Sequence, residues 1–150
     1  MRIGLVIYGS LNTVSGGYLY DRKLVDTLKA NGDEVILLSQ RWRSYPQRLS
    51  DNWDTDFVRR AAKEKLDLLL QDELNHPSLV RQNRRLRNVL GVPLVSIVHH
   101  LRSDEQRSSA LNRLYRSVER RYLNSVDGFI FNSCTTRQRV EALLERPQPS

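Results

Sequence analysis

The sequence of 150 residues predicts an α/β domain in which helices cover both faces of a doubly wound parallel sheet. Five short apolar segments alternate along the chain with segments of helical periodicity, as in repeated strand–helix units. The apolar segments do not alternate between polar and apolar residues, which is typical of strands buried on both faces. Right-handed crossovers then make a doubly wound sheet the simplest topology, and the length fits a single domain.

The predicted strands are short apolar runs bounded by residues that interrupt regular structure. They span residues 2–8, 34–39, 66–70, 94–98 and 128–131. A polar, glycine-containing loop at residues 9–17 follows the first strand, and Gly91-Val92-Pro93 precedes the fourth.

The predicted helices follow the strands at residues 18–30, 55–65, 78–90, 103–123 and 133–144, and residues 41–53 are predicted to form a loop. Asn31-Gly32 ends the first helix, because glycine readily adopts the left-handed conformation at a helix end. The longest predicted helix, at residues 103–123, carries a one-sided apolar stripe and is expected to bury it. The stripe consists of Leu111, Leu114, Tyr115, Val118 and Tyr122.

The composition excludes several classes of protein. The single cysteine, Cys134, excludes an intramolecular disulfide and a zinc site built from several cysteines. No apolar run approaches the roughly 20 residues that span a bilayer. The N-terminal apolar run is short and lacks a small-residue cleavage site, so it is predicted to be a strand rather than a signal peptide. We therefore expect a cytoplasmic location.

The net charge of +7 is concentrated in one third of the chain. Residues 78–122 contain ten arginines and three acidic residues, whereas basic and acidic residues balance elsewhere. Such a region attracts phosphates, nucleic acid or an anionic membrane surface. These arginines can equally be the solvated faces of surface helices, and the sequence leaves both interpretations open.

Ligands of doubly wound sheets bind at the carboxyl ends of the strands, which directs attention to the residues after each strand. After the first strand, Gly16 and Gly17 precede a helix, where backbone N–H groups and the helix dipole favour an anion. The segment matches neither the G-x-G-x-x-G fingerprint nor the P-loop, so a dinucleotide or ATP site is disfavoured. A glycine turn that serves only chain reversal is an equal alternative.

Polar side chains also follow the third and fourth predicted strands. Asp72 and Glu73 can bind hydroxyl groups or act as a base; a charge preference at a helix start explains Asp72, so Glu73 is the better functional candidate. His99 and His100 can donate hydrogen bonds to a substrate, and His99 is expected to lie closer to the cleft. For both histidines a purely structural role is the alternative.

Two further segments carry weaker signals. Ser133 or Asn132 is expected to cap the last helix, and no base for Cys134 as a nucleophile is evident. The cluster at residues 41–45, Arg-Trp-Arg-Ser-Tyr, either stacks on a base or sugar or packs as a loop on the sheet edge.

Together these segments resemble the N-terminal domain of retaining glycosyltransferases of the GT-B fold, family 4 (group 1). Gly16-Gly17, a helix and then Leu28-x-x-x-Gly32-Asp33-Glu34-Val35 resemble the family's "GG…L…GHEV" opening, with Asp33 in place of the usual histidine. Residues 93–99, Pro-Leu-Val-Ser-Ile-Val-His, resemble its "P-x-V-x-T-x-H" strand. Residues 119–133, from Glu119 to Ser133, resemble its "E…ADxxIxxS" segment.

The resemblance implies a Rossmann-like domain at residues 1–150 that forms the acceptor side of a transferase. Gly16 and Gly17 would face the diphosphate of a nucleotide-sugar donor, and His99 would lie near the transferred sugar. Asn12, Glu73 and His100 would contact a sugar or lipid-linked acceptor. No metal and no cofactor besides the donor substrate are expected. The sequence contains no candidate for the second, nucleotide-sugar-binding domain with its E-x7-E motif, so this length of chain is expected to be inactive alone.

The alternative hypothesis is a small flavodoxin-like binding module that recognises an anionic partner such as nucleic acid. The arginines of residues 78–122 motivate it. No nucleic-acid-binding motif is present, however, and the aromatic residues do not interleave with the basic ones as a stacking platform, so nucleic acid is the less favoured partner.

Overall fold

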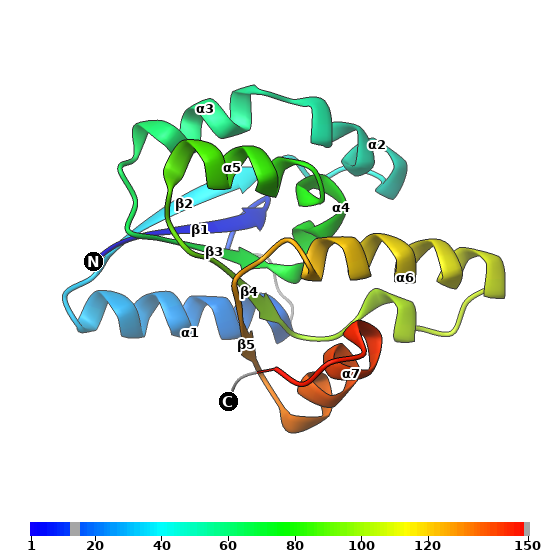
Figure 1. The fold of residues 1–150 in the computed structure, drawn as a ribbon. Helices are drawn as coiled ribbons and strands as arrows, with labels where there is room; N and C mark the ends of the chain where they lie inside the picture. Colours follow the sequence, from blue (N-terminus) through cyan, green and yellow to red (C-terminus); the bar gives the residue numbers. More distant parts are fainter. Residues whose placement is uncertain (13–15, 149–150) are drawn as a thin grey trace.

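The computed structural model describes residues 1–12 and 16–148, so the centre of the predicted glycine loop, residues 13–15, lies outside the described residues. The predicted fold class is confirmed: five parallel strands form one sheet in the order β2-β1-β3-β4-β5, between helices on its two faces (Figure 1). The strands are β1 (Arg2–Tyr8), β2 (Glu34–Gln40), β3 (Leu68–Asp72), β4 (Leu94–Val98) and β5 (Gly128–Phe131). This order is one of the two common doubly wound arrangements.

The helices divide between the two faces of the sheet. They are α1 (Gly16–Ala30), α2 (Tyr45–Ser50), α3 (Asp56–Lys63), α4 (His76–Leu79), α5 (Gln82–Leu90), α6 (Ser109–Leu123) and α7 (Cys134–Leu144). Helix α1 covers one face, where Tyr18 and Val25 pack on Ile3 and Leu5 of β1. Helices α3 and α5 cover the other face (Figure 1). No helix of the described residues is long and apolar enough to cross a membrane.

Strand β3 begins and ends two residues later than predicted. Leu66 is buried, which explains the early prediction, but Lys65 has a left-handed backbone with φ of 48° and directs the chain into the sheet only afterwards. The pairing Ile3↔Leu68 to Val6↔Gln71 with β1 then carries the strand through Asp72. As a consequence, the Asp72 side chain is fully buried at the carboxyl end of the sheet.

The prediction of a loop at residues 41–53 was wrong, because α2 and a 3₁₀ turn at Asp51–Trp53 occupy most of it. Ser44 caps the start of α2: its backbone N and Oγ both donate to Gln47 Oε1, and Pro46 lies in the first turn. The predicted helix at residues 78–90 is two helices, α4 and α5. The expected ends at Gly32 and Gly91 are confirmed, since both have positive φ.

The predicted helix at residues 103–123 begins six residues late, at Ser109, because Ser108 is extended and a 3₁₀ turn at Arg102–Asp104 precedes it. At 15 residues it equals α1 in length. Only the second half of the expected apolar stripe is buried: Leu111 and Leu114 are 36% and 46% exposed. Both leucines belong to the first half of α6, and the first turns of this helix extend beyond the sheet (Figure 1).

Candidate functional site

The strand order reverses between β1 and β3, and a pocket lies at the carboxyl ends of the strands there. It has a volume of about 400 Å³. Five of the six residues predicted for the site line it: Gly16, Gly17, Glu73, His99 and His100. Residues separated by more than 80 positions along the chain thus meet at one place. Their chemical roles remain predictions.

Gly17 lies directly against the ring of His99. A Cβ atom at Gly17 would lie 3.2 Å from His99 Cδ2, closer than ordinary side-chain contacts. Glycine at this position therefore permits the first turn of α1 to approach the histidine. Gly16 is exposed, and a Cβ atom there would meet nothing within 4 Å, so packing does not require glycine at that position.

The His99 side chain is held from two sides by α1. His99 Nε2 lies 3.2 Å from Asp21 Oδ1, and the ring of Tyr20 contacts the imidazole edge-on at 5.2 Å between centroids. Only 9% of the His99 side chain is exposed, and Asp21 is fully buried. Asp21 was not among the residues predicted for the site, although its position between Tyr18 and Val25 on the buried face of α1 is unusual for a carboxylate.

Asp72 completes a buried cluster with Asp21 and His99. One ligand atom from each of the three lies within 4.8 Å of the others. Asp72 Oδ1 accepts a hydrogen bond from the backbone N of Leu74 at 2.9 Å, so Asp72 caps the helical turn that follows β3, as expected of an acidic residue at a helix start. Asp72 Oδ2 and Asp21 Oδ2 are buried and have no hydrogen-bond partner among the described residues.

Burial and mutual repulsion change how this cluster binds protons. Burial, followed by the negative charge of Asp21, raises the pKa of Asp72 to about 7. Burial lowers the pKa of His99, but the hydrogen bond to Asp21 and the charges of Asp72 and Asp21 outweigh it, so the pKa is raised. Near neutral pH the cluster therefore holds protons that isolated carboxyl and imidazole groups would release.

The same three residues form the one group of three potential metal ligands within residues 1–12 and 16–148. The hydrogen bond between His99 and Asp21 already uses one potential ligand atom of each residue, so a metal ion would have to displace the proton that they share. Metal binding at this cluster would therefore compete with proton binding.

Glu73 lies in the wall of the pocket with its carboxyl group buried. Neither Oε atom has a hydrogen-bond partner among the residues that the structure describes. Burial, and then the charges of Asp72 and Glu119, raise the pKa of Glu73 well above its ordinary value. The raised pKa favours the protonated, neutral form of Glu73, which has an O–H donor as well as an acceptor oxygen.

The Glu73→Gln variant is expected to be more stable than the native chain at pH 8, by about 1–3 kcal/mol, and nearly equal to it at pH 4.5. The folded state retains a proton that the unfolded chain releases above its ordinary carboxyl pKa, so this group lowers stability as pH rises towards the folded pKa. Glutamine has nearly the shape of the protonated acid and does not titrate. Urea unfolding at both pH values measures the difference, and Glu145→Gln, at an exposed position, is the control. An equal difference at both pH values would contradict the assignment.

His100 and Asn12 differ from the other predicted residues. The His100 side chain is mostly exposed at the rim, with Nε2 lying 3.4 Å from Glu105 Oε1. Asn12 does not line the pocket, since its backbone N turns back to donate to Ser10 Oγ at 3.2 Å. The predicted cap is confirmed at Ser133, whose Oγ accepts from Thr136 N, and Cys134 is exposed in the first turn of α7.

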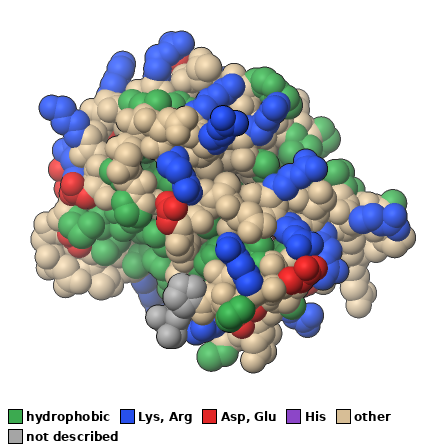
Figure 2. Space-filling model, in the orientation of Figure 1, with side chains coloured by type: hydrophobic (Ala, Val, Ile, Leu, Met, Phe, Trp, Pro, Cys, Tyr) green, Lys and Arg blue, Asp and Glu red, His purple; other side chains and the backbone are tan. Residues whose placement is uncertain are grey.

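The arginines of residues 78–122 are distributed over several elements, mainly α5 and α6. Lysine and arginine side chains are spread over the face shown in Figure 2 rather than gathered at one place. Four exposed arginines lie along α6, at Arg113, Arg116, Arg120 and Arg121, and Arg120 pairs with Glu145.

The fold and pocket define an α/β domain with a ligand site at its topological switch point. The family model described as Glycosyltransferase Family 4 matches residues 19–149, so the chain belongs to this family and is an N-terminal domain of the GT-B type. The family supports a glycosyltransferase function and sugar-containing substrates in general terms, and it does not favour the nucleic-acid-binding alternative. No curated protein matches the sequence.

Proposed function

We propose that this domain forms the acceptor side of a retaining glycosyltransferase that uses a nucleotide-sugar donor. The observation that supports this most is the hydrogen bond between His99 and buried Asp21, placed against Gly17 in the pocket. It places a histidine whose pKa is raised beside the N-terminal end of α1, where an anion is favoured. The donor nucleotide would be held by a second domain, as the family resemblance implies.

Each polar group has a distinct task in this proposal. The acceptor oxygen bonds to the anomeric carbon while the bond from that carbon to the diphosphate oxygen breaks, and the hydroxyl proton passes to the leaving diphosphate. Backbone N–H groups near Gly16 and Gly17 stabilise the developing negative charge. Asp21 occupies His99 Nε2, so Nδ1 is the ring nitrogen left to donate to the sugar or diphosphate. Glu73 and His100 bind acceptor hydroxyls, and no metal or further cofactor takes part.

We also propose a cytoplasmic enzyme whose sugar or lipid-linked acceptor lies at an anionic membrane. The start of α6 supports this part, because exposed Leu111 and Leu114 stand beside the exposed Arg113 and Arg116. Apolar and cationic side chains in this combination favour the surface of an anionic bilayer.

Titration of the ¹⁵N-labelled chain, followed by NMR, tests the proposed function. The probes are UDP-glucose, GDP-mannose, a set of methyl glycosides and disaccharides, and a single-stranded DNA oligonucleotide. Sugars or nucleotide sugars are expected to shift the signals of His99, Gly17 and Glu73, whereas the oligonucleotide is not. Oligonucleotide binding that weakens steeply with salt, without any shift from the sugar probes, would favour the alternative of a nucleic-acid-binding module.

A further inference from the structure

A second and larger hollow, of about 670 Å³, lies at the carboxyl end of β2. The segment at residues 39–43 forms one side, and residues 54–57 with Arg60 of α3 form the other. Trp42 lines both this cleft and the pocket that contains His99. A ligand that extends from the pocket past Trp42 therefore enters the cleft.

Trp42 is exposed but firmly held. Its side chain is 60% exposed, and the guanidinium of Arg48 lies 4.6 Å from its ring centroid. Arg48 is buried, contacts the ring of Tyr8 at 4.3 Å, and donates from Nε to the backbone oxygen of Arg43 at 2.8 Å. The Tyr8 ring meets Trp42 edge-on at 5.8 Å. A fixed indole with most of its surface free is a platform on which a flat apolar face can stack.

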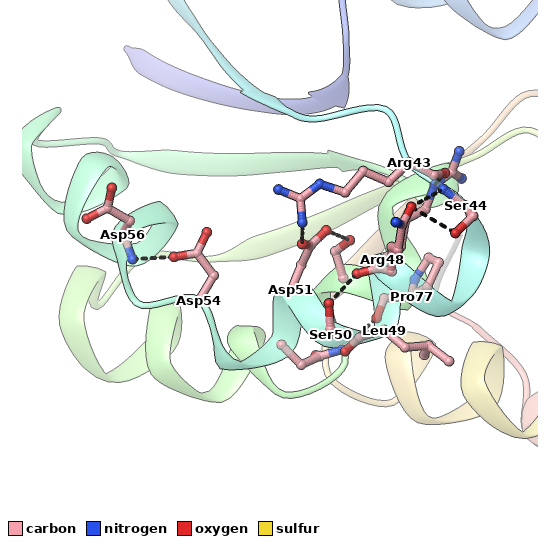
Figure 3. Close-up of polar contacts among 12 residues, drawn as sticks. Arg43, Ser44, Arg48, Leu49, Ser50, Asp51, Asp54, Asp56 and Pro77 are labelled. Atoms are coloured by element: carbon pink, nitrogen blue, oxygen red, sulfur yellow. Dashed lines mark hydrogen bonds and ion pairs between the residues drawn. The ribbon is translucent and has the colours of Figure 1, made fainter.

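The rest of the cleft carries cations and carboxylates in equal number. The cations are Arg41, Arg43 and Arg60, and the carboxylates are Asp51, Asp54 and Asp56. Figure 3 shows the arrangement: Arg43 pairs with Asp51 at 3.1 Å, and Asp54 Oδ1 accepts from the backbone N of Asp56 at 2.8 Å. Arg41 is exposed and has no hydrogen-bond partner within the part of the chain that the structure describes. These groups donate and accept hydrogen bonds, whereas their balanced charge gives no net attraction for a phosphate.

We propose that this cleft binds a second sugar unit of the acceptor, stacked on Trp42. This inference rests on the proposed glycosyltransferase function and names its acceptor class: a disaccharide or longer glycan rather than a monosaccharide. A pyranose has an apolar C–H face for the indole and hydroxyl groups that both donate and accept, which suits alternating guanidinium and carboxylate groups. The base of a nucleotide would also stack, but the phosphates of that nucleotide would enter a cleft with no net positive charge.

Tryptophan fluorescence tests the inference on the whole chain. The chain has two tryptophans, so the Trp53→Phe variant leaves Trp42 as the sole reporter. Trp53 lines neither the cleft nor the pocket. Maltose, cellobiose and lactose are titrated to ~100 mM, far above a ~1 mM dissociation constant, with methyl glucoside and inorganic phosphate as comparisons. At least one disaccharide is expected to change the emission saturably and to bind at least about tenfold more tightly than methyl glucoside.

The variants and a second signal separate failure of the inference from failure of the proposed function. In the NMR titration, Trp42→Ala should weaken disaccharide binding about tenfold or more, whereas Trp42→Phe should retain part of it. If disaccharides shift the NMR signal of His99 but leave the fluorescence emission of Trp42 unchanged, the cleft is not a sugar subsite, although the proposed function stands. If phosphate changes Trp42 emission as strongly as any disaccharide, the cleft binds anions and the inference is wrong. If no sugar affects either residue, both proposals fail.

Discussion

Replacement of His99 by alanine is expected to lower kcat about 10²- to 10³-fold, with a much smaller effect on acceptor KM, in the transferase that carries this domain. A loss of this size is typical when an enzyme loses one preorganised hydrogen-bond donor that stabilises the charge developing in the transition state. His99 is suited to this task because Asp21 fixes its ring and its pKa is raised after the opposing effect of burial. Steady-state kinetics with varied acceptor separates the two parameters.

His99→Gln gives a second test, since glutamine keeps a donor towards Asp21 but no positive charge. Its kcat should lie between those of the native enzyme and His99→Ala. Thermal unfolding of both variants accompanies the kinetics, because the alanine variant leaves the buried Asp21 carboxylate without its partner. A native kcat in a folded His99→Ala variant would remove His99 from the mechanism.

Replacement of Asp21 by asparagine is expected to lower kcat roughly tenfold, equivalent to about 1.4 kcal/mol, because Asp21 acts through His99. The hydrogen bond to Asp21 and its charge raise the pKa of His99 against burial, so their loss lowers it. If protonated His99 is the active form, activity is then lost at a lower pH on the alkaline side of the profile. NMR titration of the His99 imidazole and the pH dependence of kcat measure the two shifts.

The matched control is Asp26→Asn, an exposed carboxylate on the same helix. It should leave both the His99 pKa and the rate unchanged. The double variant of Asp21→Asn and His99→Ala should be no slower than His99→Ala alone, since the two residues act as one unit. Additive losses, or an unchanged His99 pKa in Asp21→Asn, would limit Asp21 to a structural role.

The fold was predictable because its strands are continuous apolar runs, and this signal survives without any knowledge of contacts. The ends of the strands were less predictable. Leu66 is buried yet lies outside β3, because the pairing of Leu68 with Ile3 sets the start of this strand. Helix α2 was missed because it depends on local capping by Ser44 and Gln47 rather than on a long apolar face. Leu111 and Leu114 fit a buried stripe by spacing alone, but spacing cannot show where the sheet ends.

The site was predictable where its residues lie in or next to the segments that follow the strands, and not deeper in a helix. Glu73 and His99 meet in the pocket because the carboxyl ends of parallel strands share one edge, and Gly17 joins them from the first turn of α1. Asp21 reaches His99 from 78 positions away in sequence, and no local pattern encodes that contact. The available signal was a carboxylate on the apolar face of a helix. Asp72 accepts a hydrogen bond from the backbone of Leu74 and also belongs to the buried cluster with Asp21 and His99, and only the first of these roles was predictable from the sequence.

Gly17 and Asp21 are four residues apart on α1, and so they lie one above the other on the same side of the helix. Gly17 packs against the imidazole ring of His99 without a side chain, and Asp21 is hydrogen-bonded to Nε2 of the same ring. A helix turn is stiff, so the end of α1 cannot advance towards a phosphate without carrying the partner of the imidazole with it. In the proposed function, a shift of this end of α1 towards a phosphate would therefore also change the hydrogen bond that raises the pKa of His99.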